Sequence, residues 1–309
     1  MNIVVQILLL ALGFALLVKG SDWFVDGAAG VATKLGIPQL VVGLTIVAMG
    51  TSAPELAVSL SAALKGNASI CIGNVVGSNI LNILIILGIC ALIVNVRVAK
   101  STITTEIPFM MAITAVLLLF GFTGGSISLA EGLILLALFV AYLLYLYVMA
   151  KKNPVEADEE IKNTSWIKLF VLIIIGLVAI IVGSEFTVDA ATTLAKAIGI
   201  SERFIGLTVV ALGTSLPELF TSVNAARKGN ADIAIGNIVG SNIFNILFIL
   251  GTTAMVTTIP FAEGFLIDTV IAIAAGAILW LSVVKKHMLT KVAGVVMLLA
   301  YGAYFVYLV

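Results

Sequence analysis

Two glutamates of this sequence lie in the middle of long apolar stretches. Glu55 closes the motif Gly-Thr-Ser-Ala-Pro-Glu, and Glu218 closes the motif Gly-Thr-Ser-Leu-Pro-Glu. A carboxylate at the centre of a membrane helix costs about 2.5 to 3.5 kcal/mol, so we expect both to face the interior of a helix bundle or a water-filled cavity. No basic residue of either stretch is near enough in sequence to pair with the acid. Both glutamates are therefore predicted to bind a cation that comes from outside the protein.

The residues before each glutamate suit a hard cation. Pro54 has no amide hydrogen and clashes with the carbonyl four residues earlier, so the helix is predicted to break near Gly50 and Thr51 and to release backbone oxygens. Thr51 and Ser52 precede Glu55 by four and three residues, which places both hydroxyls on the side of the carboxylate. The second motif repeats this arrangement with Thr214, Ser215, Pro217 and Glu218.

A second pair of segments could supply the other walls of the site. One polar stripe has four-residue spacing and consists of Asn74, Ser78 and Asn82, and its twin consists of Asn237, Ser241 and Asn245. We expect Asn82 and Asn245 to bind the ion directly, while the alternative for these amides is hydrogen bonding between helices. All the candidate ligands are oxygens, which favours Na⁺, Ca²⁺ or another hard ion over zinc or copper. Two carboxylates balance one Ca²⁺, and competition of ions for shared carboxylates would provide exchange.

The composition indicates an integral membrane protein. Of the 309 residues, 61% are hydrophobic and only 10% are charged, and the mean hydropathy is +1.24. A water-soluble chain would have about a quarter of its residues charged, so soluble enzymes and nucleic-acid-binding proteins are excluded. The two cysteines, Cys71 and Cys90, lie in one apolar stretch and indicate no disulfide framework. We therefore expect most of the protein surface to contact the lipid bilayer.

The apolar stretches predict an all-α protein with ten transmembrane helices, because one span needs about 20 residues. The predicted spans are residues 2–30, 37–64, 68–95, 104–123, 128–149, 165–194, 201–226, 231–257, 262–284 and 288–308. The polar segment from Lys151 to Lys162 separates five spans from five. The predicted organisation is a first five-helix repeat (1–150), a cytoplasmic linker (151–164) and a second five-helix repeat (165–309).

The two halves are related in sequence. A shift of 163 residues aligns Gly20–Gly88 with Gly183–Gly251 without a gap, and about forty of the aligned positions are identical. Because each half has an odd number of spans, the second half must enter the membrane from the opposite side. This predicts two inverted-topology repeats, which is an architecture of secondary transporters.

The Lys and Arg residues predict the orientation. The loops on one side hold about twelve of them, whereas the other side holds about three, namely Lys65, Lys196 and Arg203. Since basic loops stay in the cytoplasm, both termini are predicted outside it and the linker inside, in a cell (inner) membrane. The equivalent residues Lys65 and Lys228 then fall on opposite sides.

At these residues the sequence resembles the calcium/cation antiporter superfamily, in particular its prokaryotic sodium/calcium exchanger branch. The resemblance covers essentially the whole chain and rests on the paired Gly-Thr-Ser-x-Pro-Glu and Gly-Asn-x-x-Gly-Ser-Asn motifs. It implies ten helices, alternating access by sliding of two helices against the other eight, and exchange of Na⁺ for Ca²⁺ without a cofactor. One chain is expected to suffice for transport.

The resemblance also implies a set of ion ligands. Its calcium site corresponds to Glu55 and Glu218 with the carbonyls of Thr51 and Thr214. Its sodium sites correspond to the Ala48 carbonyl, Ser52, Glu55, Glu218 and Ser241 on one side, and to the Ala211 carbonyl, Ser78, Thr214, Ser215 and Glu218 on the other.

Departures from related branches bear on the coupling ion. Potassium-dependent relatives and some archaeal ones have Asp where this chain has Asn245, which argues against potassium co-transport. The proton/calcium branch has Gly-Asn-Ala-x-Glu in place of the Glu55 and Glu218 motifs, which argues against proton coupling. The alternatives are antiport of H⁺ or another cation, and a cation-selective channel lined by the same acids.

Two acidic pairs lie outside this constellation. Asp22 and Asp26 are four residues apart near the end of the first span, and Glu185 and Asp189 are their equivalents in the second half. We expect them to cap helices or to anchor an interface. The alternative is a vestibule that attracts cations.

Overall fold

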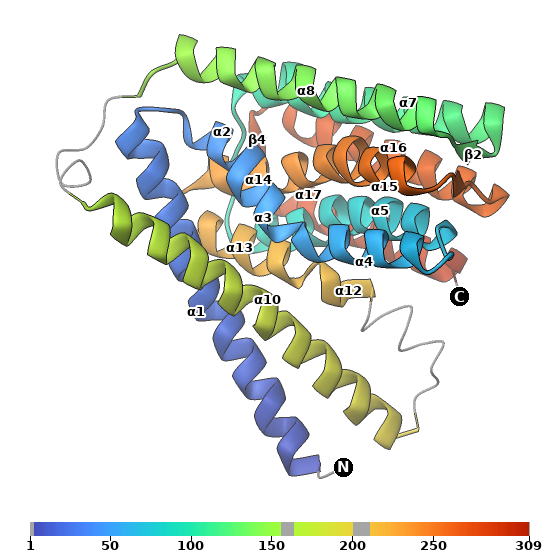
Figure 1. The fold of residues 1–309 in the computed structure, drawn as a ribbon. Helices are drawn as coiled ribbons and strands as arrows, with labels where there is room; N and C mark the ends of the chain where they lie inside the picture. Colours follow the sequence, from blue (N-terminus) through green and yellow to red (C-terminus); the bar gives the residue numbers. More distant parts are fainter. Residues whose placement is uncertain (1–2, 156–163, 200–210, 309) are drawn as a thin grey trace.

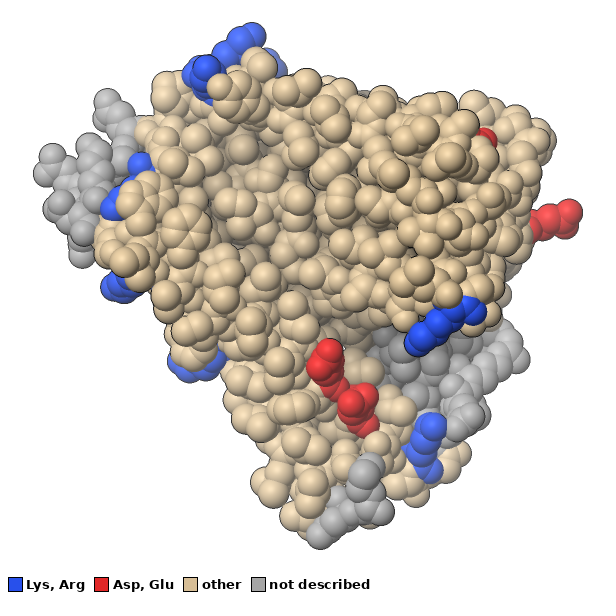
Figure 2. Space-filling view, in the orientation of Figure 1, with Lys and Arg blue, Asp and Glu red and all other residues tan. Residues whose placement is uncertain are grey.

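The structure is a computed structural model that describes residues 3–155, 164–199 and 211–308, and nearly all of these residues are helical (Figure 1). The predicted all-α class is confirmed. Figure 2 shows that most of the face seen in Figure 1 carries neither basic nor acidic side chains. An uncharged surface this broad suits lipid and not water.

Within the described ranges, eight helices are long and apolar enough to cross a membrane. Three of them contain a π-helical segment, labelled η. The eight are α1 (Ile3–Leu35), α5–η2–α6 (Ser69–Leu81, Asn82–Leu87, Gly88–Ile93), η3–α7 (Thr102–Glu106, Ile107–Gly124), α8 (Leu129–Lys152), α10 (Trp166–Ala197), α14–η5–α15 (Ala231–Phe244, Asn245–Leu250, Gly251–Val256), α16 (Glu263–Val283) and α17 (Lys291–Leu308). They correspond to eight of the predicted spans, although α1 and α10 extend beyond the predicted ends.

Two further helices are broken close to the predicted positions. A stretch formed by α2 (Gln39–Val42), η1 (Gly43–Val47) and α3 (Ala48–Thr51) bends by 46° into α4 (Ala53–Leu64). Ser52 is the residue at this bend, and Ser215 is its counterpart between α12 (Ala211–Thr214) and α13 (Leu216–Arg227). The break thus falls just after the expected Gly-Thr pair, because proline is tolerated in the first turn of a helix. Residues 201–210 of the predicted seventh span lie outside the described residues.

The broken helices pack around two central helices. The two central helices are α14–η5–α15 and α5–η2–α6. In the most apolar part of each helix, 94% of the residues of the first and 72% of the residues of the second are buried. Two short antiparallel strand pairs tie the first half of the chain to the second: β1 (Val96–Arg97) with β4 (Met288–Leu289), and β2 (Ser126–Ile127) with β3 (Ile259–Pro260). The centre of the molecule is therefore built from both halves.

Helices α1 and α10 form a separate pair that crosses beside the rest of the bundle (Figure 1). Glycines allow their backbones to touch. A Cβ atom added to Gly176 would lie 2.5 Å from the Phe24 nitrogen, and one added to Gly183 would lie 2.8 Å from the Gly13 oxygen. Because backbone atoms cannot yield as a flexible side chain can, the two helices are joined as one body.

Replacing Gly176 by valine is expected to destabilise the protein by about 1 to 3 kcal/mol, because the added atoms meet the backbone of α1. Gly302→Val is the matched control, since Gly302 also lies within a helix and nothing is within 4 Å of an added Cβ there. Thermal unfolding in detergent should show a lower midpoint for Gly176→Val only. Equal midpoints for the two variants would contradict close packing of α1 on α10.

Candidate ion-binding site

The two glutamates occupy equivalent positions just after the helix breaks. Glu55 lies in the first turn of α4 and Glu218 in the first turn of α13, and each is only 1% exposed. The amide groups at a helix N-terminus favour a carboxylate there. The two carboxylates are near enough to repel each other electrostatically. A cation between them would relieve this repulsion.

Hydroxyl groups of each half reach the glutamate of the other half. The Ser52 hydroxyl donates a hydrogen bond to Oε1 of Glu218 at 2.9 Å. Thr214 and Ser215 lie near the Glu55 carboxylate, although the Ser215 hydroxyl has no hydrogen-bond partner among the described residues. Thr51 donates to Oδ1 of Asn237 at 3.0 Å. The hydroxyls expected from the motif therefore gather at one place, on both sides of the boundary between the halves.

Four asparagines link the two central helices by reciprocal hydrogen bonds. The amide of Asn79 donates to the backbone oxygen of Asn242, and the amide of Asn242 donates to that of Asn79, both at 3.1 Å. Asn82 donates to Oδ1 of Asn242 and Asn245 donates to Oδ1 of Asn79, both at 3.0 Å. The side-chain oxygens of Asn82 and Asn245 are left over, because the nitrogens of these amides are the atoms used for bonding.

The remaining two amides of the stripes have a supporting role. Asn74 donates to the backbone oxygen of Glu55 at 3.1 Å and to Ser59 at 2.9 Å. Asn237 donates to the backbone oxygen of Glu218 at 3.4 Å and to Ser222 at 2.9 Å. These bonds fix the first turn that carries each glutamate. The alternative of hydrogen bonding between helices is thus observed for all of these amides, and ion binding by Asn82 and Asn245 stays a prediction.

Five buried oxygens of this region have no hydrogen-bond partner among the described residues: Oε2 of Glu55, Oδ1 of Asn82, Oγ of Ser215, Oε2 of Glu218 and Oδ1 of Asn245. A buried polar atom left unpaired costs about 1 to 3 kcal/mol. No group of three or more His, Cys, Asp or Glu side chains that could hold a metal occurs in the described part of the chain. The free oxygens consequently suit a hard cation and not a zinc-type metal.

The other predicted residues differ in their surroundings. The Ala48 oxygen accepts hydrogen bonds from Thr51 at 3.3 Å and from Ser241 at 3.4 Å, so Ser241 is at the site. Ser78 is buried on α5, one helical turn from Asn82. Ala211 begins α12, and its side chain lies outside the described residues. Thr214 is half-buried.

The amide cross-links through Asn79 and Asn242 were not expected from the sequence, which places both residues off the polar stripe. One signal was available, since Asn79 and Asn242 are identical at equivalent positions of the repeat. A second feature that was not expected is the π-helix. The segments η2 and η5 begin at Asn82 and Asn245, and π-helical turns often occur at functional sites.

A cleft of about 620 Å³ lies beside the site. Its walls are α4, α10 and α12, and Pro54 and Thr214 of the two glutamate motifs are among the lining residues. Glu185 and Asp189 also line it. The cleft therefore lies directly beside both glutamate motifs.

The sequence and the fold both match other membrane proteins, among them sodium/calcium exchangers. A sodium/calcium exchanger MaX1 of Methanosarcina acetivorans is 33% identical, with 99% of each chain covered, and an inner membrane protein YrbG of Escherichia coli is 38% identical over 81% of this chain and 79% of its own. Among solved structures, the sodium-calcium exchanger NCX_Mj from crystals soaked with Na⁺ and without Ca²⁺ superposes with a TM-score of 0.84, at 33% identity and 97% coverage of both chains.

The family model described as "Sodium/calcium exchanger protein" matches residues 5–148 and 168–309, which include every described residue of the site. The match extends over both halves and over both glutamate motifs. This chain is a multi-pass membrane protein that belongs to the sodium/calcium exchanger family.

Proposed function

We propose that this protein is a secondary active antiporter that exchanges Na⁺ for Ca²⁺ by alternating access, with the ions competing for Glu55 and Glu218. The observation that carries the proposal is the convergence of buried, unpartnered oxygens from both halves of the chain. The family, and the fact that MaX1 and NCX_Mj are both named as exchangers of sodium and calcium, support the choice of ions.

The ligand charges fit this pair of ions. The two carboxylates supply the two negative charges that one Ca²⁺ requires, and the amide oxygens of Asn82 and Asn245 add neutral ligands. The hydroxyls of Ser52 and Ser215 can complete smaller sites for Na⁺ around the same carboxylates. Since both loads need the same oxygens, a site filled with one ion excludes the other, which is the requirement for exchange.

The proposed architecture has ten transmembrane helices in two inverted repeats (1–150 and 165–309) joined by the linker 151–164. Contacts that recur after 163 residues support it. The bonds of Asn79 and Asn82 are repeated by Asn242 and Asn245, and the bonds of Asn74 are repeated by Asn237. Each strand pair also joins unlike elements of the two halves, as a two-fold relation would require.

The function is tested by ⁴⁵Ca²⁺ uptake into proteoliposomes with imposed ion gradients. An outward Na⁺ gradient is expected to drive uptake that saturates with Ca²⁺, whereas an outward K⁺ or H⁺ gradient is not. Uptake driven by H⁺ alone would establish the proton antiporter instead. Uptake that needs no counter-ion and does not saturate would establish a channel.

The orientation is proposed with both termini outside the cytoplasm and the linker inside, in a cell (inner) membrane. Support comes from the Lys and Arg distribution and from the name of the inner membrane protein YrbG. A cysteine at Asn153, which is exposed after α8, should be labelled by an impermeant reagent only from the cytoplasmic side. Thr123 is exposed near the C-terminal end of α7, in front of the loop that leads to the start of α8, and this loop is proposed to lie outside the cytoplasm. A cysteine at Thr123 should therefore be labelled in intact cells. The reverse pattern would overturn the orientation.

A further inference from the structure

The two repeats make unequal contacts beside the ion site. On one side α13 packs along α1, and the rings of Phe14 and Phe220 lie 6.2 Å apart. On the other side the equivalent helices, α10 and α4, are separated by the cleft of about 620 Å³. One side of the site is thus closed and the other side is open, although the two sides have closely related sequences.

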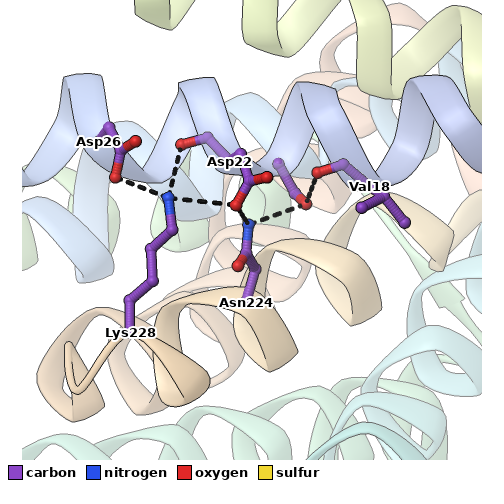
Figure 3. A network of polar contacts seen from close by, with 6 residues as sticks. Val18, Asp22, Asp26, Asn224 and Lys228 are labelled. Atoms are coloured by element: carbon purple, nitrogen blue, oxygen red, sulfur yellow. Dashed lines mark hydrogen bonds and ion pairs between the residues drawn. The ribbon is translucent and has the colours of Figure 1, made fainter.

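A charged network holds the closed side together (Figure 3). Nζ of Lys228, which follows α13, lies 3.1 Å from Oδ1 of Asp22 and 2.7 Å from Oδ1 of Asp26, both on α1. It also donates to the backbone oxygen of Asp22 at 3.2 Å. Asn224 donates to Oδ1 of Asp22 at 2.8 Å and to Ser21 at 3.2 Å. Two turns of α1 are therefore bound by one end of α13.

The same charges exist on the open side without the contact. Lys65 is the counterpart of Lys228, and Glu185 and Asp189 are the counterparts of Asp22 and Asp26. Within the described ranges, Lys65, Glu185 and Asp189 form no ion pair. Glu185 and Asp189 instead face the cleft, with α4 as its opposite wall.

We propose that Lys228 and Lys65 are alternating electrostatic latches. Lys228 holds α1 on α13 in the state with the cleft open, and Lys65 binds Glu185 and Asp189 when α10 closes onto α4. The proposal rests on the alternating access proposed above and names charged groups that select between its two states.

The packing of α1 on α10 explains why the latches must alternate. Because backbone atoms of the two helices are in contact, the pair moves as one body. A movement that brings α10 onto α4 takes α1 away from α13, so the two latches cannot be closed together. The proposed inverted repeat explains why there are two latches, because Lys228 on one side of the molecule has Lys65 as its counterpart on the other side.

Distances between spin labels at the ends of these helices test the proposal in the full-length protein, with Cys71 and Cys90 replaced by alanine. Leu64→Cys with Ile198→Cys reports on the cleft side, and the equivalent pair Arg227→Cys with Leu35→Cys reports on the latched side. All four positions are exposed. Movement should change the two distances in opposite directions.

Lys228→Gln is expected to shift the populations toward the state with the cleft closed by about two- to fivefold, as for a partly exposed ion pair. Lys228→Glu, which adds repulsion from Asp22 and Asp26, should shift them further. Lys65→Gln should shift them the opposite way. Lys228→Arg, which keeps the positive charge, should leave the populations of the two states as in the native protein. Lys286 is an exposed lysine outside the network, so Lys286→Gln should also leave them unchanged.

Unchanged distances in both Lys228→Gln and Lys228→Glu would overturn the proposal. If Lys65→Gln shifts the two spin-label distances in the same direction as Lys228→Gln, the proposal is overturned as well, because that result indicates that any loss of a lysine destabilises the helix packing. These distances are measured without transport. If exchange of Na⁺ for Ca²⁺ fails while the distances shift as stated, the proposed function is wrong and the proposal on Lys228 and Lys65 stands. If exchange is normal and the distances do not shift, the proposed function stands and the proposal on Lys228 and Lys65 is wrong.

Discussion

Replacing Glu55 or Glu218 by glutamine is expected to reduce Na⁺-driven Ca²⁺ uptake to the level of empty liposomes. In the proposed site, where both side chains are only 1% exposed, each substitution removes one of the two charges that would balance Ca²⁺. A divalent ion left with one carboxylate in such surroundings is not neutralised, and burial of an unbalanced charge is strongly unfavourable. Glutamine has nearly the same shape, so the helix break and its packing should persist.

The control for this pair is Glu263→Gln. Glu263 also lies in the first turn of a helix but is exposed, so its loss should leave the uptake unchanged. Thermal unfolding of the three variants should be compared, because lost uptake is informative only where the protein is folded. Near-normal uptake by Glu55→Gln or Glu218→Gln would remove that acid from the ion site.

The family and the fold class could be predicted from the sequence for definite physical reasons. A chain with 10% charged residues and a mean hydropathy of +1.24 leaves few alternatives to membrane helices. The breaks in α3–α4 and α12–α13 could be located within about two residues, since Pro54 and Pro217 exert a local steric effect that needs no tertiary information.

The contacts within the site could be predicted less well. Helical periodicity places Asn82 and Asn74 on one stripe and leaves Asn79 off it, yet Asn79 and Asn242 make the bonds that join the two halves. Those bonds depend on how α5 and α14 cross, which side-chain spacing along one helix does not contain. The same crossing decides which oxygens of the asparagines remain free. The assignment of individual ligands therefore stays a prediction.

Which side of the molecule is closed could not be predicted from the sequence. Lys65 and Lys228 stand at equivalent positions of two halves that share about forty identical residues, so periodicity and motif spacing treat them alike. In the structure, Lys228 binds Asp22 and Asp26, while Glu185 and Asp189 face a cleft. For Asp22 and Asp26, the expected interface anchor is what the structure shows. The difference between the halves arises from the position of α1 and α10, which local sequence does not determine.

Exchange by this protein is expected to respond to membrane voltage. In the proposed site, two carboxylates serve either ion load, and the amide positions, Asn82 and Asn245, are neutral. If three Na⁺ replace one Ca²⁺, as the resemblance to the prokaryotic exchangers implies, each cycle moves one net positive charge, worth about 2.3 kcal/mol per 100 mV. The Ca²⁺ gradient reached at a given Na⁺ gradient should then change about fiftyfold per 100 mV.

The same residues imply that exchange needs no potassium. The resemblance implies that Asn245 stands where potassium-dependent relatives have Asp. Its nitrogen donates to Asn79 at 3.0 Å, so this position offers a neutral oxygen and no additional negative charge. Na⁺-driven Ca²⁺ flux should be measured in liposomes with potentials set by valinomycin, and then with choline in place of K⁺ and no ionophore. Flux independent of voltage would indicate electroneutral exchange. Flux lost without K⁺ would show that a neutral side chain at Asn245 is compatible with potassium dependence, and the inference from this residue would be wrong.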